Sequence, residues 1–437
     1  MASRKRRAYW LFSFLAATAF FFLYGLILLP EQQRITTGER VHLELAFPAN
    51  LLARCGWWQP ETEENWPIAT KPGQLSLKLR LLGLIPVKTV VVEVVEPPRV
   101  IPGGHAIGVL LRTSGAVVVG YAPVVTSTGE TVYPARQAGL LLGDTITGIN
   151  GWRITSDDQA ALLIDRQGRA GQTLRLTVRR GKELLSFSLR PVFCRETGRY
   201  RIGLYIRDSA AGVGTLTFYL PERKVFGALG HMVVEGGADE PAPLSGGRIV
   251  EATIQGIQHG RRGQPGEKIG FFLNGEGMVG SIKQNTRYGI FGTLERLPQG
   301  TAHLPPVPVA LAHQVRPGAA EMLTVINGKA IERFAIEIER VMPQRREEGK
   351  GLVLRITDPR LLALTGGIVQ GMSGSPILQD GALVGAVTHV FVQDPARGYG
   401  VFAEWMLQES GLFSRGSVEK PKTLAPALRR KGFPLRV

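Results

Sequence analysis

The sequence predicts a mainly β protein that carries one N-terminal transmembrane helix. Short apolar segments with period-2 alternation recur along the chain, long helical patterns are few, and one apolar run of about 20 residues follows a basic N-terminus. The chain has 437 residues, of which 44% are hydrophobic, so it is long enough for two or three domains with separate cores.

Residues 1–30 are expected to form a cytoplasmic basic stub and a membrane anchor. The basic cluster 4–7 precedes the apolar run 9–29. Because Lys and Arg favour the cytoplasmic side, we expect the N-terminus to stay inside and the rest of the chain to be translocated. The alternative is a cleaved signal peptide, but the run exceeds the usual apolar core of roughly 7–15 residues and no small-x-small site follows it.

Residues 31–100 are predicted to be a β-rich region, because "QLSLKLRLLGLIPVKTVVVEVV" alternates apolar and polar residues and is rich in β-branched side chains. At the other end, residues 414–437 are expected to be a basic tail. The two cysteines, Cys55 and Cys194, have no metal-binding motif around them. In a translocated protein they are either one disulfide or two buried thiols.

Residues 101–191 form a unit with its own turn signals. "TSDDQAALLIDRQG" predicts a helix capped by Thr155 or Ser156, and "TLRLTVRRGKELLSFSLRP" predicts a hairpin. "YPARQAGLLLGDTITGING" resembles the core motif of PDZ domains attached to membrane-associated proteases. The resemblance implies that a peptide adds to a strand edge beside a glycine-bearing loop, which we assign to Ile107, Gly108 and Val109. The alternative is ordinary strand entry, with a groove that is empty or occupied by the chain itself.

Residues 192–413 are predicted to be a β-rich domain that presents one serine in "GMSGSP". Gly371 and Gly374 flank Ser373 and permit a tight turn in which the amides of Gly371 and Ser373 face one pocket. The turn and the apolar hairpin after it resemble the "G-D-S-G-G-P" segment of chymotrypsin-like peptidases, which implies that Ser373 is the nucleophile. Ser375 is then a small residue packed behind the turn.

A serine needs a base to act as a nucleophile at neutral pH. The histidines of this half are His231, His259, His303, His313 and His389. Glycines surround His231 in "FGALGH", a context in which an imidazole can be held at the edge of a cleft. His259 lies in an arginine-rich loop, and His389 follows Ser373 closely on the outgoing strand. His231 is therefore the preferred candidate.

A second resemblance covers residues 38–413. The segments "RIGLYIRDSAAGVGTLTFYLP", "FGALGH", "GQPGEKIG", "ITDPRLL", "TGGIVQGMSGSPI" and "GAVTHVFVQDPARGYGVF" occur in the order found in the stage IV sporulation protein B family of serine peptidases. The resemblance implies a PDZ domain fused to a chymotrypsin-like double β-barrel peptidase domain. It assigns Ser373 as nucleophile, His231 as base and Asp358 as the acid.

The acid is the least secure of these assignments. Asp358 lies only 15 residues before the serine, and an aspartate in "T-D-P" can equally form a turn. Glu235 and Asp239, just after the histidine, are the alternatives. The family tends to carry an Ile-Ser/Thr-Asp run after the histidine, whereas this chain has "MVVEGG".

The family resemblance further implies a membrane-tethered enzyme in the space between the two membranes around a forespore. There it would cleave a regulatory membrane partner of an intramembrane metalloprotease, and also its own chain. No cofactor or metal is expected. The formal charge of +16 makes an anionic membrane surface a possible partner. Nucleic acid is not expected, since no aromatic-basic platform, zinc pattern or recognition helix accompanies the charge. The competing function is a catalytically silent PDZ-containing module that recruits a membrane partner.

Overall fold

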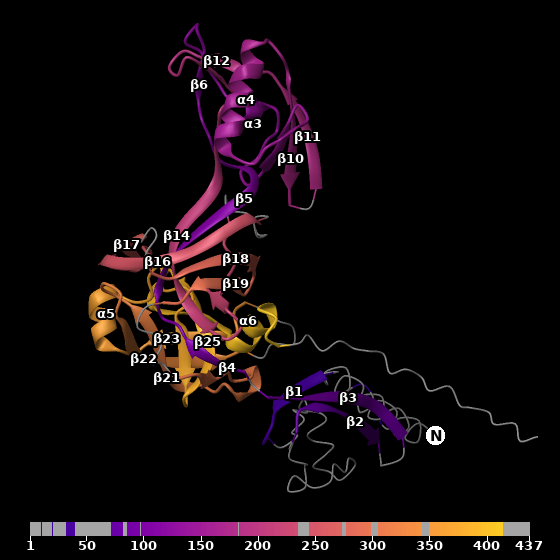
Figure 1. The fold of residues 1–437 in the computed structure, drawn as a ribbon, viewed down its shortest axis with the longest axis vertical. Helices are drawn as coiled ribbons and strands as arrows, with labels where there is room; N and C mark the ends of the chain where they lie inside the picture. The colour runs from indigo at the N-terminus through magenta and orange to yellow at the C-terminus, as the bar shows by residue number, and fades with distance from the viewer. Residues whose placement is uncertain are drawn as a thin grey trace, which may run out of the picture.

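Antiparallel strands make up most of the protein in the computed structural model (Figure 1). The structure describes Trp10, Phe20 and residues 32–39, 71–81, 85–96, 98–181, 183–234, 244–272, 277–298, 305–342 and 349–413. Within these ranges the mainly β prediction is confirmed, and none of the helices is long and apolar enough to cross a membrane. Apart from Trp10 and Phe20, the predicted anchor lies outside the described residues, as do the predicted basic tail and Cys55. Cys194 is buried and has a free thiol.

The N-terminal region forms a small separate sheet. Its strands β1 (Gln32–Thr36), β2 (Gly73–Leu81) and β3 (Ile85–Val95) lie in the order β1-β3-β2, with β1 parallel to β3. The strands predicted from alternation in this region are therefore confirmed.

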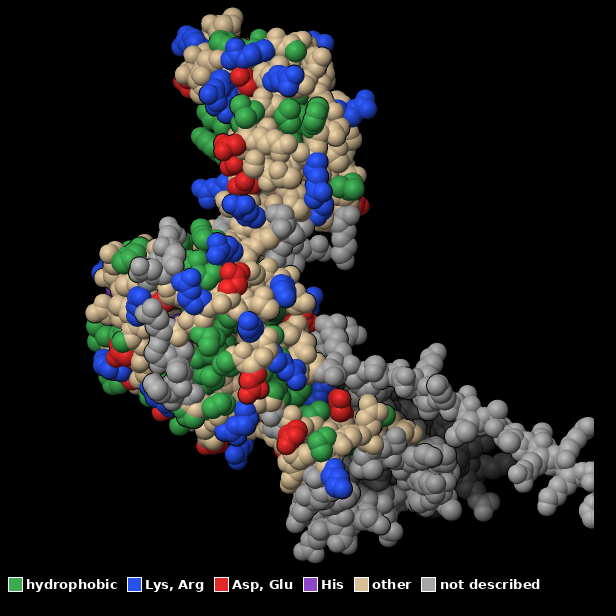
Figure 2. Space-filling view, in the orientation of Figure 1, with side chains coloured by type: hydrophobic (Ala, Val, Ile, Leu, Met, Phe, Trp, Pro, Cys, Tyr) green, Lys and Arg blue, Asp and Glu red, His purple; other side chains and the backbone are tan. Residues whose placement is uncertain are grey.

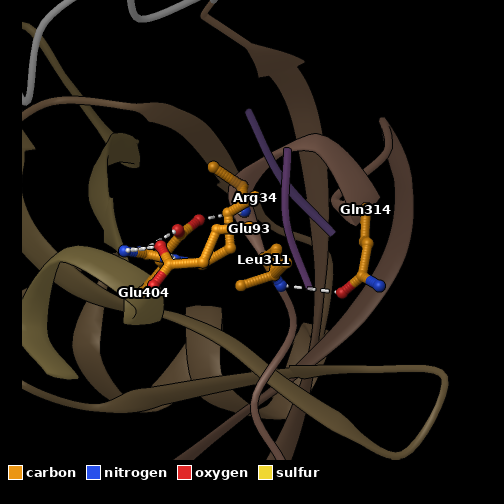
Figure 3. A network of polar contacts seen from close by, with 6 residues as sticks. Arg34, Glu93, Leu311, Gln314 and Glu404 are labelled. Atoms are coloured by element: carbon orange, nitrogen blue, oxygen red, sulfur yellow. Dashed lines mark hydrogen bonds and ion pairs between the residues drawn. The ribbon is translucent and has the colours of Figure 1, made fainter. Parts of the chain in front are cut away.

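An ion-pair network holds this sheet against the end of the last barrel (Figure 3). The Arg34 guanidinium donates hydrogen bonds to Glu93 Oε2 at 3.0 and 3.1 Å and to Glu404 Oε1 at 2.9 Å. Glu404 belongs to α6 (Ala403–Glu409), and its second oxygen accepts the N–H of Ala312 at 2.9 Å. Because both carboxylates share the arginine and Glu404 is buried, the network fixes the sheet to the folded domain rather than leaving it tethered by the chain alone.

Six strands close a first barrel. They are β5 (Ala106–Tyr121), β14 (Leu204–Leu220), β15 (Val225–Ala228), β16 (Leu244–Gln258), β18 (Val279–Thr286) and β19 (Gly289–Arg296). The pairings run β5-β16-β18-β19-β15-β14 and return to β5, all antiparallel. Apolar side chains such as Ile107, Phe226, Ile249 and Ile290 fill the interior.

Six further strands form a second closed barrel. In ring order they are β21 (Gly318–Val325), β22 (Ile331–Val341), β23 (Leu352–Ile356), β26 (Asp394–Phe402), β25 (Ala382–Phe391) and β24 (Pro376–Gln379). Its core contains Met322, Phe334, Ile377 and Phe402. These two rings of paired strands confirm the predicted double barrel.

An α+β unit lies on one side of the first barrel. It contains β6 (Val124–Val125), β7 (Thr131–Val132), α3 (Pro134–Gln137), β8 (Thr145–Ile149), β9 (Trp152–Arg153), α4 (Asp157–Arg169), β10 (Leu174–Arg180), β11 (Glu183–Leu189), β12 (Val192–Cys194) and β13 (Arg199–Arg201). Ser156 caps α4 by accepting the N–H of Gln159, and β10 pairs with β11, as predicted. The aspartate of the "LGD" motif, Asp144, is buried and receives two hydrogen bonds of 2.7 Å from Arg180.

This unit is an insertion between two neighbouring strands of the barrel. The first part of β5 pairs with β14 over Ala106–Arg112 and Ser209–Thr215, and both strands then continue into the unit, where Val117–Tyr121 pairs with Leu204–Arg207. Figure 1 shows the unit standing on these two strands. The strand pairing therefore places residues 106–113 in the barrel, inside the range 101–191 that the sequence assigns to the PDZ-like unit.

The remaining elements are β4 (Arg99–Pro102), β17 (Glu267–Phe272), β20 (Val307–Pro308), the short 3-10 helix η2 (Ala312–Gln314) and α5 (Pro359–Thr365).

Candidate active site

Ser373 lies in a tight turn between α5 and β24 that only glycine permits at two positions. Gly371 and Gly374 both have φ of 92°, in the left-handed region that favours glycine. A Cβ on Gly374 would lie 2.1 Å from the carbonyl oxygen of Thr215. The two glycines of "GMSGSP" thus allow the turn to pack closely against the first barrel and leave Ser373 half-buried at the surface of the turn.

Strand β14 of the first barrel clamps this turn of the second. Thr215 donates its N–H to Ser373 O at 2.9 Å and its hydroxyl to Gly371 O at 2.8 Å. The hydroxyl of Thr217 donates to Gly374 O at 2.8 Å. Three buried contacts therefore fix the turn at the interface between the barrels.

The clamp leaves two amides of the turn available. Met372 N–H donates to Val369 O and Gly374 N–H donates to Val387 O. Among the described residues, the N–H groups of Gly371 and Ser373 have no hydrogen-bond acceptor. Two fixed, unpaired amides on either side of one residue are what an oxyanion site requires, in agreement with the prediction from the sequence.

His231 follows β15, in a segment that contacts the same residue, Thr388, as the Ser373 hydroxyl. Its Nδ1 lies 2.8 Å from Met232 O, a contact in which Nδ1 carries the proton and Nε2 the lone pair. The residue before it, Gly230, lies against Thr388, and the carbonyl of Thr388 accepts the hydroxyl of Ser373 at 2.8 Å. The serine hydroxyl and the residue before the histidine thus both contact Thr388, and the hydroxyl is bonded to that carbonyl rather than to the imidazole.

A second imidazole lies beside the first. The ring centroids of His231 and His389 are 4.9 Å apart. Burial lowers the pKa of His231, and the pKa of His389 is lowered to about 4 by desolvation and by the charges of His231 and Lys350, although part of its ring reaches solvent. Both rings are therefore neutral at pH 7, which is the state that a general base requires.

Comparison with family models decides the identity of this domain. Residues 198–407 match the model described as SpoIVB peptidase S55, and residues 106–190 match the PDZ domain. The chain carries an S55 serine peptidase domain with a PDZ domain. The family predicted from the ordered sequence segments is confirmed.

Solved structures of several proteases are similar to parts of the S55 chain. The inactive form of Rv3671c from M. tuberculosis H37Rv, a Ser-to-Ala mutant, is 15% identical, with 46% of this chain and 83% of that chain covered and a TM-score of 0.24. The HtrA-type protease AlgW with a decapeptide is 11% identical, with 48% of this chain and 53% of that chain covered and a TM-score of 0.28. The protease Anisep from Arthrobacter nicotinovorans is 11% identical, with 47% of this chain and 91% of that chain covered and a TM-score of 0.30. No curated protein sequence matches the chain.

Asp358, which the family resemblance assigns as the acid, lies at the start of α5 and makes no contact with His231 among the described residues. Its Oδ1 accepts the N–H groups of Arg360 and Leu361 at 2.9 and 3.2 Å, and its Oδ2 accepts the N–H of Ala335 at 3.4 Å. Asp358 is the N-cap of α5, and the proline after it begins the helix. These contacts are those of the turn-forming alternative, in which "T-D-P" supplies the cap locally.

The part of the chain that the structure describes places no carboxylate in contact with His231. Glu235 and Asp239 lie outside that part. The side chain of Asn285, on β18, holds the segment after the histidine instead: its Nδ2 donates to Val233 O at 2.8 Å and its Oδ1 accepts Val233 N–H at 2.9 Å. Nothing in the local sequence "IKQNTR" indicates this role, which depends on the closure of the first barrel.

Replacing Asp358 by alanine should therefore affect stability and not catalysis. We expect a loss of about 1 kcal/mol in the free energy of unfolding, the usual cost of removing an N-cap. Peptidase activity should stay within about threefold of wild type at a temperature where both are folded. Chemical denaturation and a turnover assay check this. A loss of activity of about 10⁴-fold with unchanged stability would restore Asp358 as the acid.

The structure contradicts the assignment of Ile107, Gly108 and Val109 to the peptide groove of the PDZ domain. All three lie in the barrel part of β5, where Gly108 pairs with Val213 on one side and Val250 on the other. Ile107 is fully buried, and Phe272 covers Gly108. Because both strand edges are occupied, no peptide can add there.

A free strand edge does exist in the PDZ domain, at the start of β14. The segment Leu204–Arg207 pairs with β5 on one side, and no described strand pairs with its other edge, near α4. Gly203, directly before this strand, has φ of 77°, in the left-handed region that favours glycine. The apolar-Gly-apolar pattern of "RIGLYI" was the available signal, and the sequence prediction placed it instead after the PDZ unit.

Proposed function

We propose that this S55 peptidase is a membrane-tethered, self-cleaving serine endopeptidase of sporulation signalling. Its substrate would be a regulatory membrane partner of an intramembrane metalloprotease that matures a late sigma factor. The observation that supports endopeptidase action is the turn in which Gly371 and Ser373 present two unpaired amides, with the Ser373 hydroxyl bound to Thr388 O and the neutral imidazole of His231 beside the next residue, His389. The membrane and sporulation parts of the proposal rest on the family resemblance and on the apolar run 9–29.

The geometry supports acyl transfer in the following order. The Ser373 hydroxyl leaves Thr388 O, gives its proton to His231 Nε2, and its oxygen attacks the carbonyl carbon of the substrate peptide. The resulting oxyanion is bound by the N–H groups of Gly371 and Ser373. The imidazolium then protonates the leaving amine, and water hydrolyses the acyl-enzyme through the same histidine. The hydroxyl's present bond to Thr388 makes the described state a resting one.

The PDZ domain would present an extended peptide to the peptidase. The free edge at Leu204–Arg207 can accept a peptide strand, with backbone hydrogen bonds supplying affinity. The peptide would come from the membrane partner or from the chain itself. Electrostatic attraction to anionic lipid would be weak by comparison, since Lys and Arg in Figure 2 are scattered among Asp and Glu over the PDZ domain and the barrels.

The self-cleavage is tested with the full chain in membranes. We expect wild type to convert itself into shorter products and Ser373→Ala to remain intact while still folded. When the two are mixed, with the variant carrying an epitope tag, wild type should cleave the tagged chain if processing is intermolecular. Processing of Ser373→Ala alone at the wild-type rate would exclude self-cleavage by this serine.

The silent binding module is the competing function, and the disengaged Ser373 hydroxyl is the observation that fits it. Cleavage of the co-expressed membrane partner separates the two functions. Retention of the partner in complex without any Ser373-dependent product would favour the module.

A further inference from the structure

Strand β17 has an inverted burial pattern. Lys268 is 1% exposed, whereas its neighbours Ile269 and Phe271 are 54% and 44% exposed. Burying an amine while two large apolar side chains face solvent is unfavourable for folding. The inward orientation of the Lys268 side chain is therefore not explained by a gain in folding stability. The contacts of Lys268 lead instead to the turn that carries Ser373.

The backbone and stem of Lys268 support the entry to that turn. Its N–H donates to Gln370 O at 2.9 Å, and Gln370 N–H donates to Gly266 O at 2.8 Å. The aliphatic stem packs beneath Gly371, where an added Cβ would lie 3.1 Å from both Cβ and Cδ of the lysine. Strand β17, which pairs with β16 of the first barrel, thus contacts Gln370 and Gly371, and the N–H of Gly371 is one of the two oxyanion donors.

The amine reaches the other side of the same turn. Lys268 Nζ donates to Thr324 Oγ1 at 2.7 Å, in β21 of the second barrel. The hydroxyl of Ser375 donates to that same oxygen at 3.1 Å. Lys268 is therefore connected to both flanks of Ser373, through Gly371 on one side and through Thr324 and Ser375 on the other.

No carboxylate of the described residues contacts the Lys268 amine. The neighbouring strands carry the carboxylates Glu267 on β17, Glu251 on β16, Glu321 on β21 and Glu332 on β22, and His259 lies in the loop before β17. Three of these carboxylates, on β16, β21 and β22, are bound by Lys329, Arg333 and Arg360. Burial alone lowers the pKa of Lys268 to about 7.

We infer that Lys268 is a positioning residue of the Ser373 site, whose stem holds Gly371 in place and whose buried ammonium stabilises the negative charge that develops on the oxyanion. The inference rests on the proposed role of Ser373 as nucleophile. A charge on a buried side chain whose stem packs against Gly371 acts at low dielectric, where electrostatic stabilisation is strongest. Lys268 is not the general base, because its amine is bound to Thr324 and the Ser373 hydroxyl to Thr388.

The test compares Lys268→Met with wild type in the full chain. Methionine keeps an apolar stem of similar length and removes the charge. The readout is the rate constant of covalent labelling by a fluorophosphonate probe from pH 5 to pH 10. We expect wild type to react faster than the variant by on the order of tenfold at pH 6, and the two rates to converge by about pH 9, where Lys268 is neutral. Lys283→Met, at an exposed site on β18, should match wild type throughout.

Stability gives a second, independent readout. A buried ammonium destabilises the fold below pH 7, and this cost falls as pH rises from about 7 toward the ordinary lysine pKa, because only the unfolded chain then stays protonated. Lys268→Met should therefore melt higher than wild type at pH 6, and the gap should narrow toward pH 9. If the methionine variant does not fold, Thr324→Val provides the test. The variant removes the acceptor of the Lys268 ammonium, which lowers the pKa of the amine, so the fall in the labelling rate at alkaline pH should begin at a lower pH than in wild type.

The outcomes of these experiments separate the role of Lys268 from the role of Ser373 as nucleophile. A wild-type to Lys268→Met ratio that is constant with pH would reduce Lys268 to a packing role, and a ratio near one everywhere would remove its role altogether. Both results leave Ser373 as nucleophile, provided that Ser373→Ala is unlabelled. Labelling of Ser373→Ala at the wild-type rate would overturn the nucleophile and this inference together.

Discussion

Replacing Ser373 by alanine should lower peptidase turnover by about 10⁴- to 10⁶-fold and abolish labelling by a fluorophosphonate probe. The oxygen that would form the acyl-enzyme is then missing, while the clamp by Thr215 and Thr217 uses only backbone carbonyls of the turn and stays intact. Circular dichroism and the melting temperature should therefore be unchanged. Turnover and probe labelling of purified protein check the prediction.

The second serine of the turn is the matched control. Ser375 is fully buried and donates to Thr324, away from the unpaired amides. We expect Ser375→Ala to keep turnover within about tenfold of wild type. If Ser375→Ala were inactive and Ser373→Ala active, the nucleophile would have been assigned to the wrong serine.

Replacing His231 by alanine should reduce turnover to the same extent as loss of the serine, because the two act as one unit. The neighbouring His389→Ala should keep turnover within about tenfold, since its imidazole contacts His231 and no described hydrogen bond joins it to Ser373. Activity of wild type should rise with pH through a pKa below 6.5, because burial favours the neutral form of His231. Rate measurements on both variants from pH 4 to pH 8 check this.

Two results would contradict the assignment of His231. One is an acid limb with its midpoint above pH 6.5, which would require a base whose pKa is not lowered by burial. The other is a His389→Ala variant as inactive as His231→Ala, which would place the base on β25.

Local chemistry explains what the sequence predicted correctly. The glycines around Ser373, the Ser156 cap and the alternation in β10 and β11 each specify a conformation through neighbours in the chain. The ordered family segments then located His231. The turn, the cap and the alternation are each determined by residues within one short segment, so a single sequence was sufficient to identify them.

The predictions that the structure does not support concern contacts between distant segments. The pattern of "AIGVLL" is that of a strand in either domain, and only its pairing with β14 and β16 assigns Ile107 to the barrel. Asp358 has the residue type of an acid, but three backbone N–H groups occupy its carboxylate. No prediction from the sequence concerned the burial of Lys268, which depends on a contact between strands far apart in the chain: its amine donates to Thr324 in the second barrel.

The insertion of the PDZ domain between β5 and β14 makes the peptidase discontinuous in sequence. The segment that matches the S55 model, 198–407, contains five of the six strands of the first barrel and lacks β5. A fragment cut at that boundary would have an open barrel with two unpaired edges, a form prone to aggregation. A complete peptidase without a PDZ domain would instead require a short turn in place of residues 114–207. Strand β14 also carries the free edge at Leu204 and the clamp at Thr215, so the proposed peptide-binding edge and the turn of Ser373 share one continuous backbone.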